Sequence, residues 1–123
     1  MKLVVIGTGY VGLVSGLCFA EFGFDITCVD KNQNRLDKLK EYKSPFYEPG
    51  LEDLLYKHVK NTKLVILTNN IGESLKDADV IFITVGTPTR RLENEADLTE
   101  VYEVAKEISN NINKYCIIVT KST

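Results

Sequence analysis

Apolar residues along this chain fall into short, nearly continuous runs that alternate with longer stretches of mixed character. The short runs have the length of strands, and a run without polar alternation is typical of a strand covered on both faces. Strands are predicted at 2–6, 24–29, 64–67, 80–85 and 116–120. Helices are predicted from residue 13 to about residue 22, over 33–40, 51–59 and 73–76, and from residue 97 onward.

This alternation of strands and helices predicts an α/β fold with one parallel sheet and right-handed crossovers. We expect a doubly wound, Rossmann-type sheet with the strand order 3-2-1-4-5, counted along the chain. The 123 residues fit one domain, 1–123, and contain no internal repeat. In such a sheet, ligands bind beyond the carboxyl ends of the strands where the order reverses, between strands 1 and 4.

The first predicted strand leads directly into a glycine-rich turn, G-x-G-x-x-G over residues 7–12, which a helical pattern follows. Gly7 and Gly9 lack a Cβ, so the backbone can turn sharply and approach a pyrophosphate closely. Gly12 allows the helix to pack tightly on the sheet. The unpaired N–H groups and the partial positive charge at the helix start favour a diphosphate.

The second predicted strand ends on Asp30, 18 residues after Gly12. A carboxylate at this place accepts hydrogen bonds from the adenosine ribose of a dinucleotide. A 2′-phosphate would meet like charge there, so the expected cofactor is NAD rather than NADP. Arg35 follows on the next predicted helix, close to the end of the same strand.

Two further segments, 85–89 and 121–123, reach the same edge of the predicted sheet. Gly86 permits close backbone approach, Thr87 offers a hydroxyl, and Pro88 stiffens the loop. We therefore expect both segments to take part in cofactor binding. The candidates there are Val85, Gly86, Thr87, Pro88, Ser122 and Thr123.

The composition is that of a globular protein, with 44% hydrophobic and 26% charged residues and a net charge of −2. No cluster of Lys and Arg is long enough to indicate a nucleic-acid surface, and no apolar run approaches the about 20 residues of a membrane span. The first residues lack the pattern of a signal peptide. We expect a cytoplasmic protein without nucleic-acid or membrane partners.

The three cysteines, Cys18, Cys28 and Cys116, lie in apolar runs without C-x-x-C spacing. We expect them to be small buried hydrophobic residues rather than disulfide partners or metal ligands, and we predict no metal site. His58 is the sole histidine and has lysines nearby in sequence. It is predicted to be a surface or helix-end residue rather than a catalytic base.

Taken together, these segments resemble the amino-terminal, NAD-binding domain of the UDP-glucose/GDP-mannose dehydrogenase family. The resemblance extends over the whole chain, and the set of motifs is far more specific than the glycine turn alone. The matching stretches are GTGYVG with Tyr10 and Val11 at 7–12, Asp30 with Arg35, YEPGLE at 47–52, VGTP at 85–88, ADL at 96–98 and KST at 121–123.

The resemblance implies an enzyme that oxidises the C6 alcohol of a nucleotide sugar to a carboxylate in two NAD-dependent steps, with a cysteine capturing the aldehyde as a thiohemiacetal. It favours UDP-glucose, oxidised to UDP-glucuronate, with GDP-mannose or a UDP-N-acetyl sugar as alternatives. It places the glycine turn, Tyr10 and Val11 at the pyrophosphate, and Arg35 beside the adenosine. Residues 86–88 would line the path to the nicotinamide. Thr123 would be catalytic, positioning the water that hydrolyses the thioester.

One departure from the family pattern is that residues 90–95 stand where an Asp-Gly pair usually follows the TP dipeptide, which leaves the conformation of this loop open. The resemblance also implies that the remaining strands, the catalytic cysteine, the substrate domain and the dimer helix lie beyond residue 123. We assign no catalytic cysteine and expect the fragment to be inactive and its parent to be a homodimer through other regions. A non-catalytic NAD(H)-sensing domain and an S-adenosylmethionine methyltransferase are alternatives that share the turn and the acid.

Overall fold

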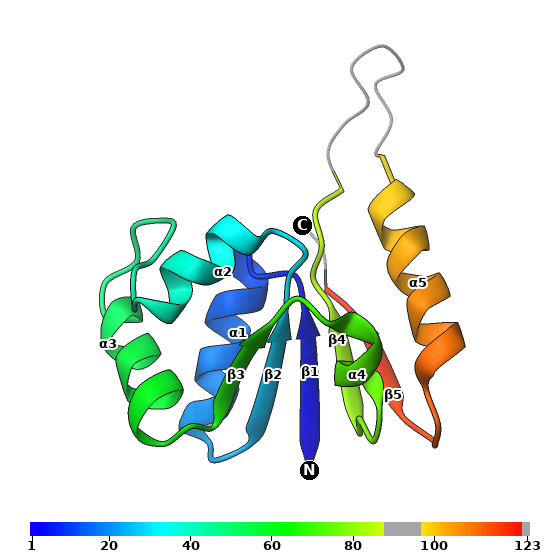
Figure 1. Ribbon diagram of the computed structural model, residues 1–123, viewed down its shortest axis with the longest axis horizontal. Helices are drawn as coiled ribbons and strands as arrows, with labels where there is room; N and C mark the ends of the chain where they lie inside the picture. The colour runs from blue at the N-terminus through cyan, green and yellow to red at the C-terminus, as the bar shows by residue number, and fades with distance from the viewer. Residues whose placement is uncertain (88–96, 122–123) are drawn as a thin grey trace.

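The computed structural model describes residues 1–87 and 97–121. Within these ranges the chain forms a five-stranded parallel sheet in the order β3-β2-β1-β4-β5 (Figure 1). The observed order confirms the predicted doubly wound fold. The strands are β1 (Lys2–Ile6), β2 (Asp25–Val29), β3 (Val65–Thr68), β4 (Val80–Ile83) and β5 (Ile117–Thr120).

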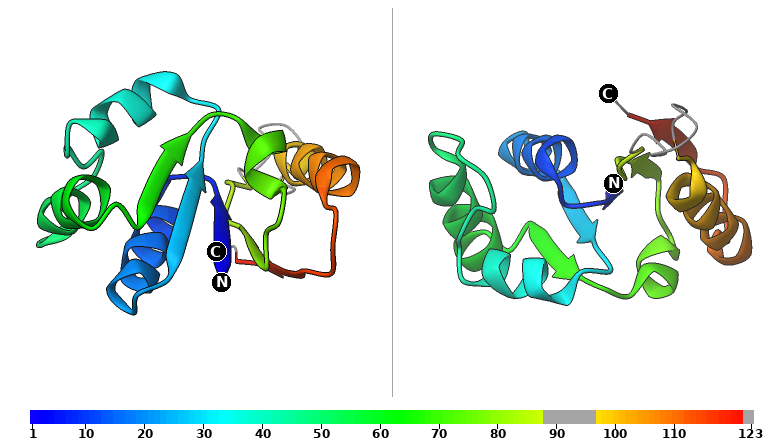
Figure 2. Two further views of the ribbon diagram at one scale, coloured as in Figure 1. Left: turned by 60° about the horizontal axis from the view of Figure 1, so that its bottom comes forward. Right: turned by 90° about the horizontal axis from the view of Figure 1, so that it is seen from above.

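Helices lie on both faces of this sheet (Figure 2). They are α1 (Tyr10–Glu21), α2 (Gln33–Lys40), α3 (Leu51–Leu55) with the π-helix η1 (Tyr56–Asn61), α4 (Ile71–Leu75) and α5 (Thr99–Asn111). The helices α1 and α3 cover one face, and α4 and α5 cover the other. A sheet between two helical layers buries both sides of its central strands, which explains their continuous apolar runs.

The central strand β1 sends alternate side chains into two separate cores. Leu3 and Val5 pack with α1 on one face, while Val4 and Ile6 pack with α5 on the other. All four side chains are almost completely buried. Because β1 is held on both faces and by two neighbouring strands, the glycine turn that follows it starts from a firmly anchored position.

The element boundaries differ from the predicted ones by one to three residues. β4 ends at Ile83 rather than at residue 85, so Val85 belongs to the loop above the sheet. The helix predicted from residue 97 begins at Thr99, with Leu98 as its N-cap. Asp97 Oδ1 instead accepts from the backbone N–H of Thr99 at 3.0 Å and from its hydroxyl at 2.6 Å. This local turn closes on Thr99, the first residue of α5, so Asp97 stands outside the helix.

The predicted helix over 51–59 is two elements. After α3 the chain widens into η1, where the N–H of Thr62 donates to the carbonyl of Lys57, five residues earlier, at 2.8 Å. His58 lies in the last turn of η1, as a helix-end residue would, but it is only 2% exposed, so the expectation of a surface residue is wrong. The wider turn changes which side chains face inward, and a pattern read at 3.6 residues per turn misses this change.

The cysteines also differ in their surroundings. Cys28 is buried in β2 and Cys116 is half-buried, but Cys18 is exposed on α1, so the expectation of burial is wrong for Cys18. Burial raises the pKa of the Cys28 thiol to about 12, which keeps this sulfur protonated. None of the helices within the described ranges is long and apolar enough to cross a membrane.

Candidate cofactor site

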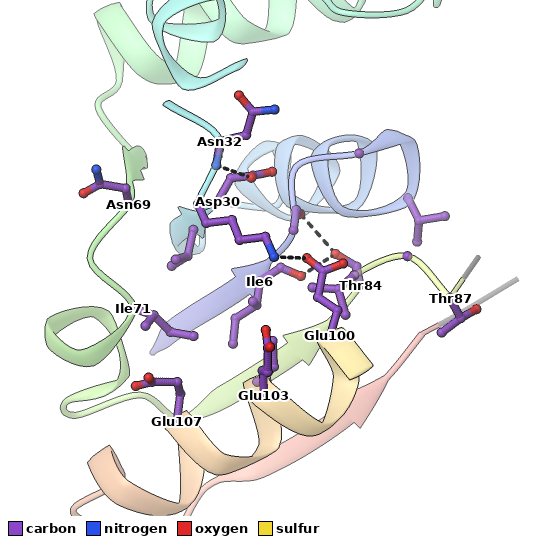
Figure 3. Close-up of a pocket in the computed structure, with 18 of the residues that line it drawn as sticks. Ile6, Asp30, Asn32, Asn69, Ile71, Thr84, Thr87, Glu100, Glu103 and Glu107 are labelled. Atoms are coloured by element: carbon purple, nitrogen blue, oxygen red, sulfur yellow. Dashed lines mark hydrogen bonds and ion pairs between the residues drawn. The ribbon is translucent and has the colours of Figure 1, made fainter. Parts of the chain in front are cut away.

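A cleft of about 990 Å³ opens at the carboxyl ends of the central strands, where the strand order reverses between β1 and β4. Its walls come from the glycine turn, the end of β2, the loop after β4 and one side of α5 (Figure 3). The sequence-predicted residues that line it are Gly7, Gly9, Tyr10, Val11, Asp30, Arg35, Val85, Gly86 and Thr87. Pro88, Ser122 and Thr123 lie outside the described residues.

A side chain at each of the three glycines of the turn would meet different surroundings. Gly7 has φ +103°, a left-handed conformation that strains any residue with a Cβ. At Gly12 a Cβ would overlap the carbonyl oxygen of Gly7 and the hydroxyl of Thr84. At Gly9 a Cβ would meet nothing within 4 Å. Gly7 and Gly12 are therefore required by the fold, whereas Gly9 leaves open space at the start of α1.

That open space lies at the N-terminus of α1, where Gly9 is the N-cap and no side chain caps the helix. Uncapped N–H groups in a first helical turn, together with the partial positive charge there, attract an anion. Thr84, which follows β4, supports the turn from below. Its hydroxyl donates to the carbonyl of Ile6 at 2.8 Å and lies 3.1 Å from that of Gly7. The turn is thus rigid and presents its backbone to the cleft.

Asp30 stands beside this turn and is 8% exposed. Its Oδ2 accepts from the backbone N–H of Thr8 at 2.9 Å, from the Thr8 hydroxyl at 2.5 Å and from Arg35 Nη1 at 3.0 Å. Its Oδ1 accepts from the N–H of Asn32 at 2.9 Å. The carboxylate therefore joins the glycine turn, the end of β2 and α2.

Burial alone would raise the pKa of Asp30, but the hydrogen bonds from Thr8 and Asn32 and the charge of Arg35 outweigh it and lower this pKa below its usual value. Asp30 is consequently ionised at neutral pH. A hydrogen-bonded, ionised carboxylate at the rim of a cleft accepts from sugar hydroxyls and repels a phosphate.

The opposite wall comes from α5. Figure 3 shows Asp30 on one side of the cleft and Glu103 and Glu107 on the other. Ile71 on α4 and Val104 on α5 supply apolar surface to the cleft. An apolar floor with carboxylates at its rim suits a neutral aromatic base and disfavours an additional phosphate.

Two polar contacts lie at the edges of the cleft. Lys31 Nζ lies 3.6 Å from Glu100 Oε1, so an ion pair joins the end of β2 to the start of α5. On the other side, the half-exposed Tyr10 donates its hydroxyl to Glu48 Oε2 at 2.8 Å, and its ring centroid lies 5.1 Å from that of Phe46. The hydrogen bond to Glu48 raises the pKa of Tyr10. The two contacts of Tyr10 hold the segment before α3 against the glycine turn.

Sequence reasoning overlooked several residues of this site. Thr8 occupies a variable position of the glycine motif, and its burial was not visible in the pattern. Thr84 falls within the strand predicted over 80–85 and reads as one of its residues. The acidic side of α5 reads as an ordinary solvated face. A polar residue at the carboxyl end of a central parallel strand, as at Thr84, was the one available signal.

A glycine turn before α1, a carboxylate at the end of β2 and a cleft at the reversal of strand order define a dinucleotide-binding Rossmann domain. Comparison with protein families agrees that this is a dinucleotide-binding domain and identifies one family. Residues 1–123 match the model of the UDP-glucose/GDP-mannose dehydrogenase family, NAD binding domain. The chain belongs to this family, and its cofactor is NAD.

Individual relatives have related names. The chain is 46% identical over 123 residues to the UDP-glucose 6-dehydrogenase of Rhizobium meliloti, covering 100% of the chain and 28% of that protein. It is 48% identical over 122 residues to the UDP-glucose 6-dehydrogenase TuaD of Bacillus subtilis, covering 99% of the chain and 26% of that protein. The chain thus spans about a quarter of the length of these relatives.

Solved structures resemble the fold closely. A ternary complex of GDP-mannose dehydrogenase from Pseudomonas aeruginosa superposes with a TM-score of 0.91 at 33% identity, covering 100% of this chain and 28% of that one. A UDP-glucose dehydrogenase from Pyrobaculum islandicum superposes with a TM-score of 0.91 at 30% identity, covering 99% of this chain and 28% of that one. Both similarities cover the whole architecture described above.

Proposed function

We propose that this chain is the cofactor domain of a UDP-glucose 6-dehydrogenase, acting as one NAD-binding unit over residues 1–123. The substrate assignment is supported by the relatives named UDP-glucose 6-dehydrogenase, which are 46% and 48% identical to the chain. The binding mode is supported by one observation above all. An ionised, hydrogen-bonded Asp30 stands beside an uncapped helix start at the rim of a large cleft.

In this proposal the pyrophosphate binds along residues 7–12, with Tyr10 and Val11 at the first turn of α1. Asp30 accepts hydrogen bonds from the adenosine ribose, and Arg35 flanks the adenosine. Val85, Gly86 and Thr87, in the loop after β4, contact the nicotinamide end of the cofactor together with Pro88. Ser122 and Thr123 complete the site, with Thr123 orienting a water for thioester hydrolysis. When bound, NAD supplies the hydride acceptor for each oxidation step.

We further propose that the 123-residue chain binds NAD but does not oxidise UDP-glucose by itself. No cysteine is among the described residues that line the cleft. Cys18 is exposed on α1, and Cys28 is buried with its pKa raised to about 12. Cys116 is half-buried next to β5 and is not a residue of the cleft either. None of the three thiols is placed to attack a substrate carbon beside a bound nicotinamide, because a nucleophile needs both access to the cleft and thiolate character.

The first experiment is a calorimetric titration of the chain with NAD and with NADP. We expect saturable binding of NAD and clearly weaker binding of NADP, since the 2′-phosphate would lie beside the Asp30 carboxylate. Equal affinity for the two cofactors, or no binding of NAD, would contradict the proposed binding mode. Addition of UDP-glucose to the NAD-loaded chain should produce no NADH absorbance at 340 nm.

The substrate needs a second experiment, because a GDP-mannose dehydrogenase superposes as closely as a UDP-glucose dehydrogenase. The protein that contains this domain together with its substrate-binding part is assayed with UDP-glucose, GDP-mannose and UDP-N-acetylmannosamine. We expect the highest kcat/KM for UDP-glucose. A higher kcat/KM for GDP-mannose would assign the domain to the sister enzyme and leave the NAD site unchanged.

A further inference from the structure

We infer that Thr8, the residue between the first two glycines, is a positioning residue that sets the selectivity of this site for NAD over NADP. It does so by fixing the orientation of the Asp30 carboxylate, so that one oxygen is fully occupied and the other receives the ribose. This inference rests on the proposed binding of the adenosine ribose at Asp30 and adds the residue that controls it.

The hydrogen bonds of Asp30 are unevenly divided between its two oxygens. Oδ2 accepts three donors, the N–H and hydroxyl of Thr8 and the guanidinium of Arg35. Oδ1 accepts one donor, the N–H of Asn32. A carboxylate oxygen has about two lone-pair sites, so Oδ2 has no capacity left and Oδ1 has one site left. A ribose hydroxyl that enters the cleft is therefore received by Oδ1.

Thr8 holds this arrangement from a completely buried position, with 0% of its surface exposed. Its N–H and its hydroxyl converge on the same oxygen at 2.9 and 2.5 Å. Two donors from one residue resist rotation of the carboxylate, and loss of the hydroxyl leaves Oδ2 with only the Thr8 N–H and Arg35 to hold it. Any residue except proline supplies the N–H at this position, but a short side chain with a hydroxyl requires threonine or serine.

Arg35 explains why orientation affects cofactor choice. Its Nη1 lies 3.0 Å from Asp30 Oδ2, and its side chain is partly exposed towards the cleft. A guanidinium beside the adenosine ribose is also a good partner for a 2′-phosphate. While Thr8 keeps Oδ2 in place, Asp30 neutralises Arg35 and keeps negative charge next to the 2′ position. Loss of the hydroxyl loosens the pair and frees Arg35 for a phosphate.

The test compares Thr8→Val, which removes the hydroxyl at nearly constant volume, with Thr8→Ser, which retains it. For Thr8→Val we expect the Kd for NAD to rise about tenfold, which is the loss of one hydrogen bond to a charged group. The Kd for NADP should change little, because the weaker hold on the ribose is offset by the release of Arg35 for the 2′-phosphate, so the selectivity ratio falls about tenfold. Thr8→Ser should keep the ratio within about twofold of the parent chain. The matched control is Thr27→Val, which changes a different buried threonine, in β2, and should change neither Kd.

A merely structural role for Thr8 is separated by a double-mutant cycle with Asp30→Asn. If Thr8 acts through Asp30, Thr8→Val causes no further loss of selectivity in the Asp30→Asn chain. An additive loss, an unchanged ratio in folded Thr8→Val, or a Thr8→Ser chain as unselective as Thr8→Val would overturn the inference. Thr8→Ala replaces Thr8→Val in the same comparison if the valine variant does not fold. Failure of the parent chain to bind NAD would instead reject the proposed function.

Discussion

At the scale of single residues, the site depends on a few groups whose surroundings give them their properties. Asp30 is the clearest case, because burial alone would favour its neutral form and only its hydrogen bonds and Arg35 keep it ionised. The glycine turn likewise depends on where each missing Cβ would lie. Two predictions follow at this scale, one for ligand binding and one for stability.

Replacing Asp30 with alanine should weaken NAD binding by about 1–3 kcal/mol, because a hydrogen-bonded charge at the ribose is lost. Calorimetric titration of the folded variant measures the effect. Asp37→Ala is the control, since Asp37 is exposed on α2 and is not among the residues that line the cleft. An Asp30→Ala chain that binds NAD as tightly as its parent would exclude Asp30 from the site.

The second residue-scale prediction contrasts two glycines in the same turn. Gly12→Ala should destabilise the chain by at least about 2 kcal/mol, because its Cβ would overlap backbone and a buried hydroxyl. Gly9→Ala should leave stability within about 1 kcal/mol, since a Cβ there meets open space. The same Gly9 variant should bind NAD more weakly, because its Cβ enters the space assigned to the pyrophosphate. Urea unfolding and NAD titration measure the two effects, and equal stability of the two variants would contradict the packing argument.

At the scale of elements, the segment α3–η1 shows how a change in helical pitch builds a tertiary contact. The π-turn brings His58 into the interior, where Glu21 at the end of α1 lies 2.6 Å from Nε2. Lys57 on the same π-turn also contacts Glu21, at 2.9 Å. Hydrogen bonds from Lys57 and His58 lower the pKa of Glu21. The cluster fastens η1 to α1 at the end of the sheet opposite the cleft (Figure 1).

The prediction for this element is that His58→Ala lowers the free energy of unfolding by about 2–3 kcal/mol. The variant removes a fully packed side chain and leaves Glu21 and Thr62 without their shared partner. Affinity for NAD should stay within about twofold, because His58 is not a residue of the cleft. Asn61→Ala on the exposed side of η1 is the control for urea unfolding. If both variants lost equal stability, a specific role for the His58–Glu21 contact would be ruled out.

At the scale of the whole molecule, the sheet is covered unevenly. β5 lies at one edge of the described sheet, and its consecutive residues Ile117 and Ile118 point to opposite faces. They are 51% and 47% exposed, and Tyr115 beside them is also exposed. An edge strand with apolar side chains open on both faces is a surface on which another polypeptide can pack.

We therefore predict that the chain self-associates with rising concentration and that Ile117→Glu reduces this association. Sedimentation velocity over a hundredfold concentration range measures it. Ile66→Glu is the matched control, because Ile66 is an exposed apolar residue on β3 at the opposite edge. A strictly monomeric parent chain, or an equal effect of the Ile66 variant, would contradict the assignment of association to β5.

The sequence by itself determined the order of strands and helices, the glycine turn, the place of Asp30 and the family, because each of these depends on local pattern and on spacing along the chain. The carboxyl-end position of the cleft also follows, since parallel strands bring their ends to one edge. Only the tertiary structure decided that Thr8 holds Asp30, that Glu103 and Glu107 face the cleft and that His58 is buried. These properties depend on which side chains distant elements bring into contact, and no short-range pattern records such contacts.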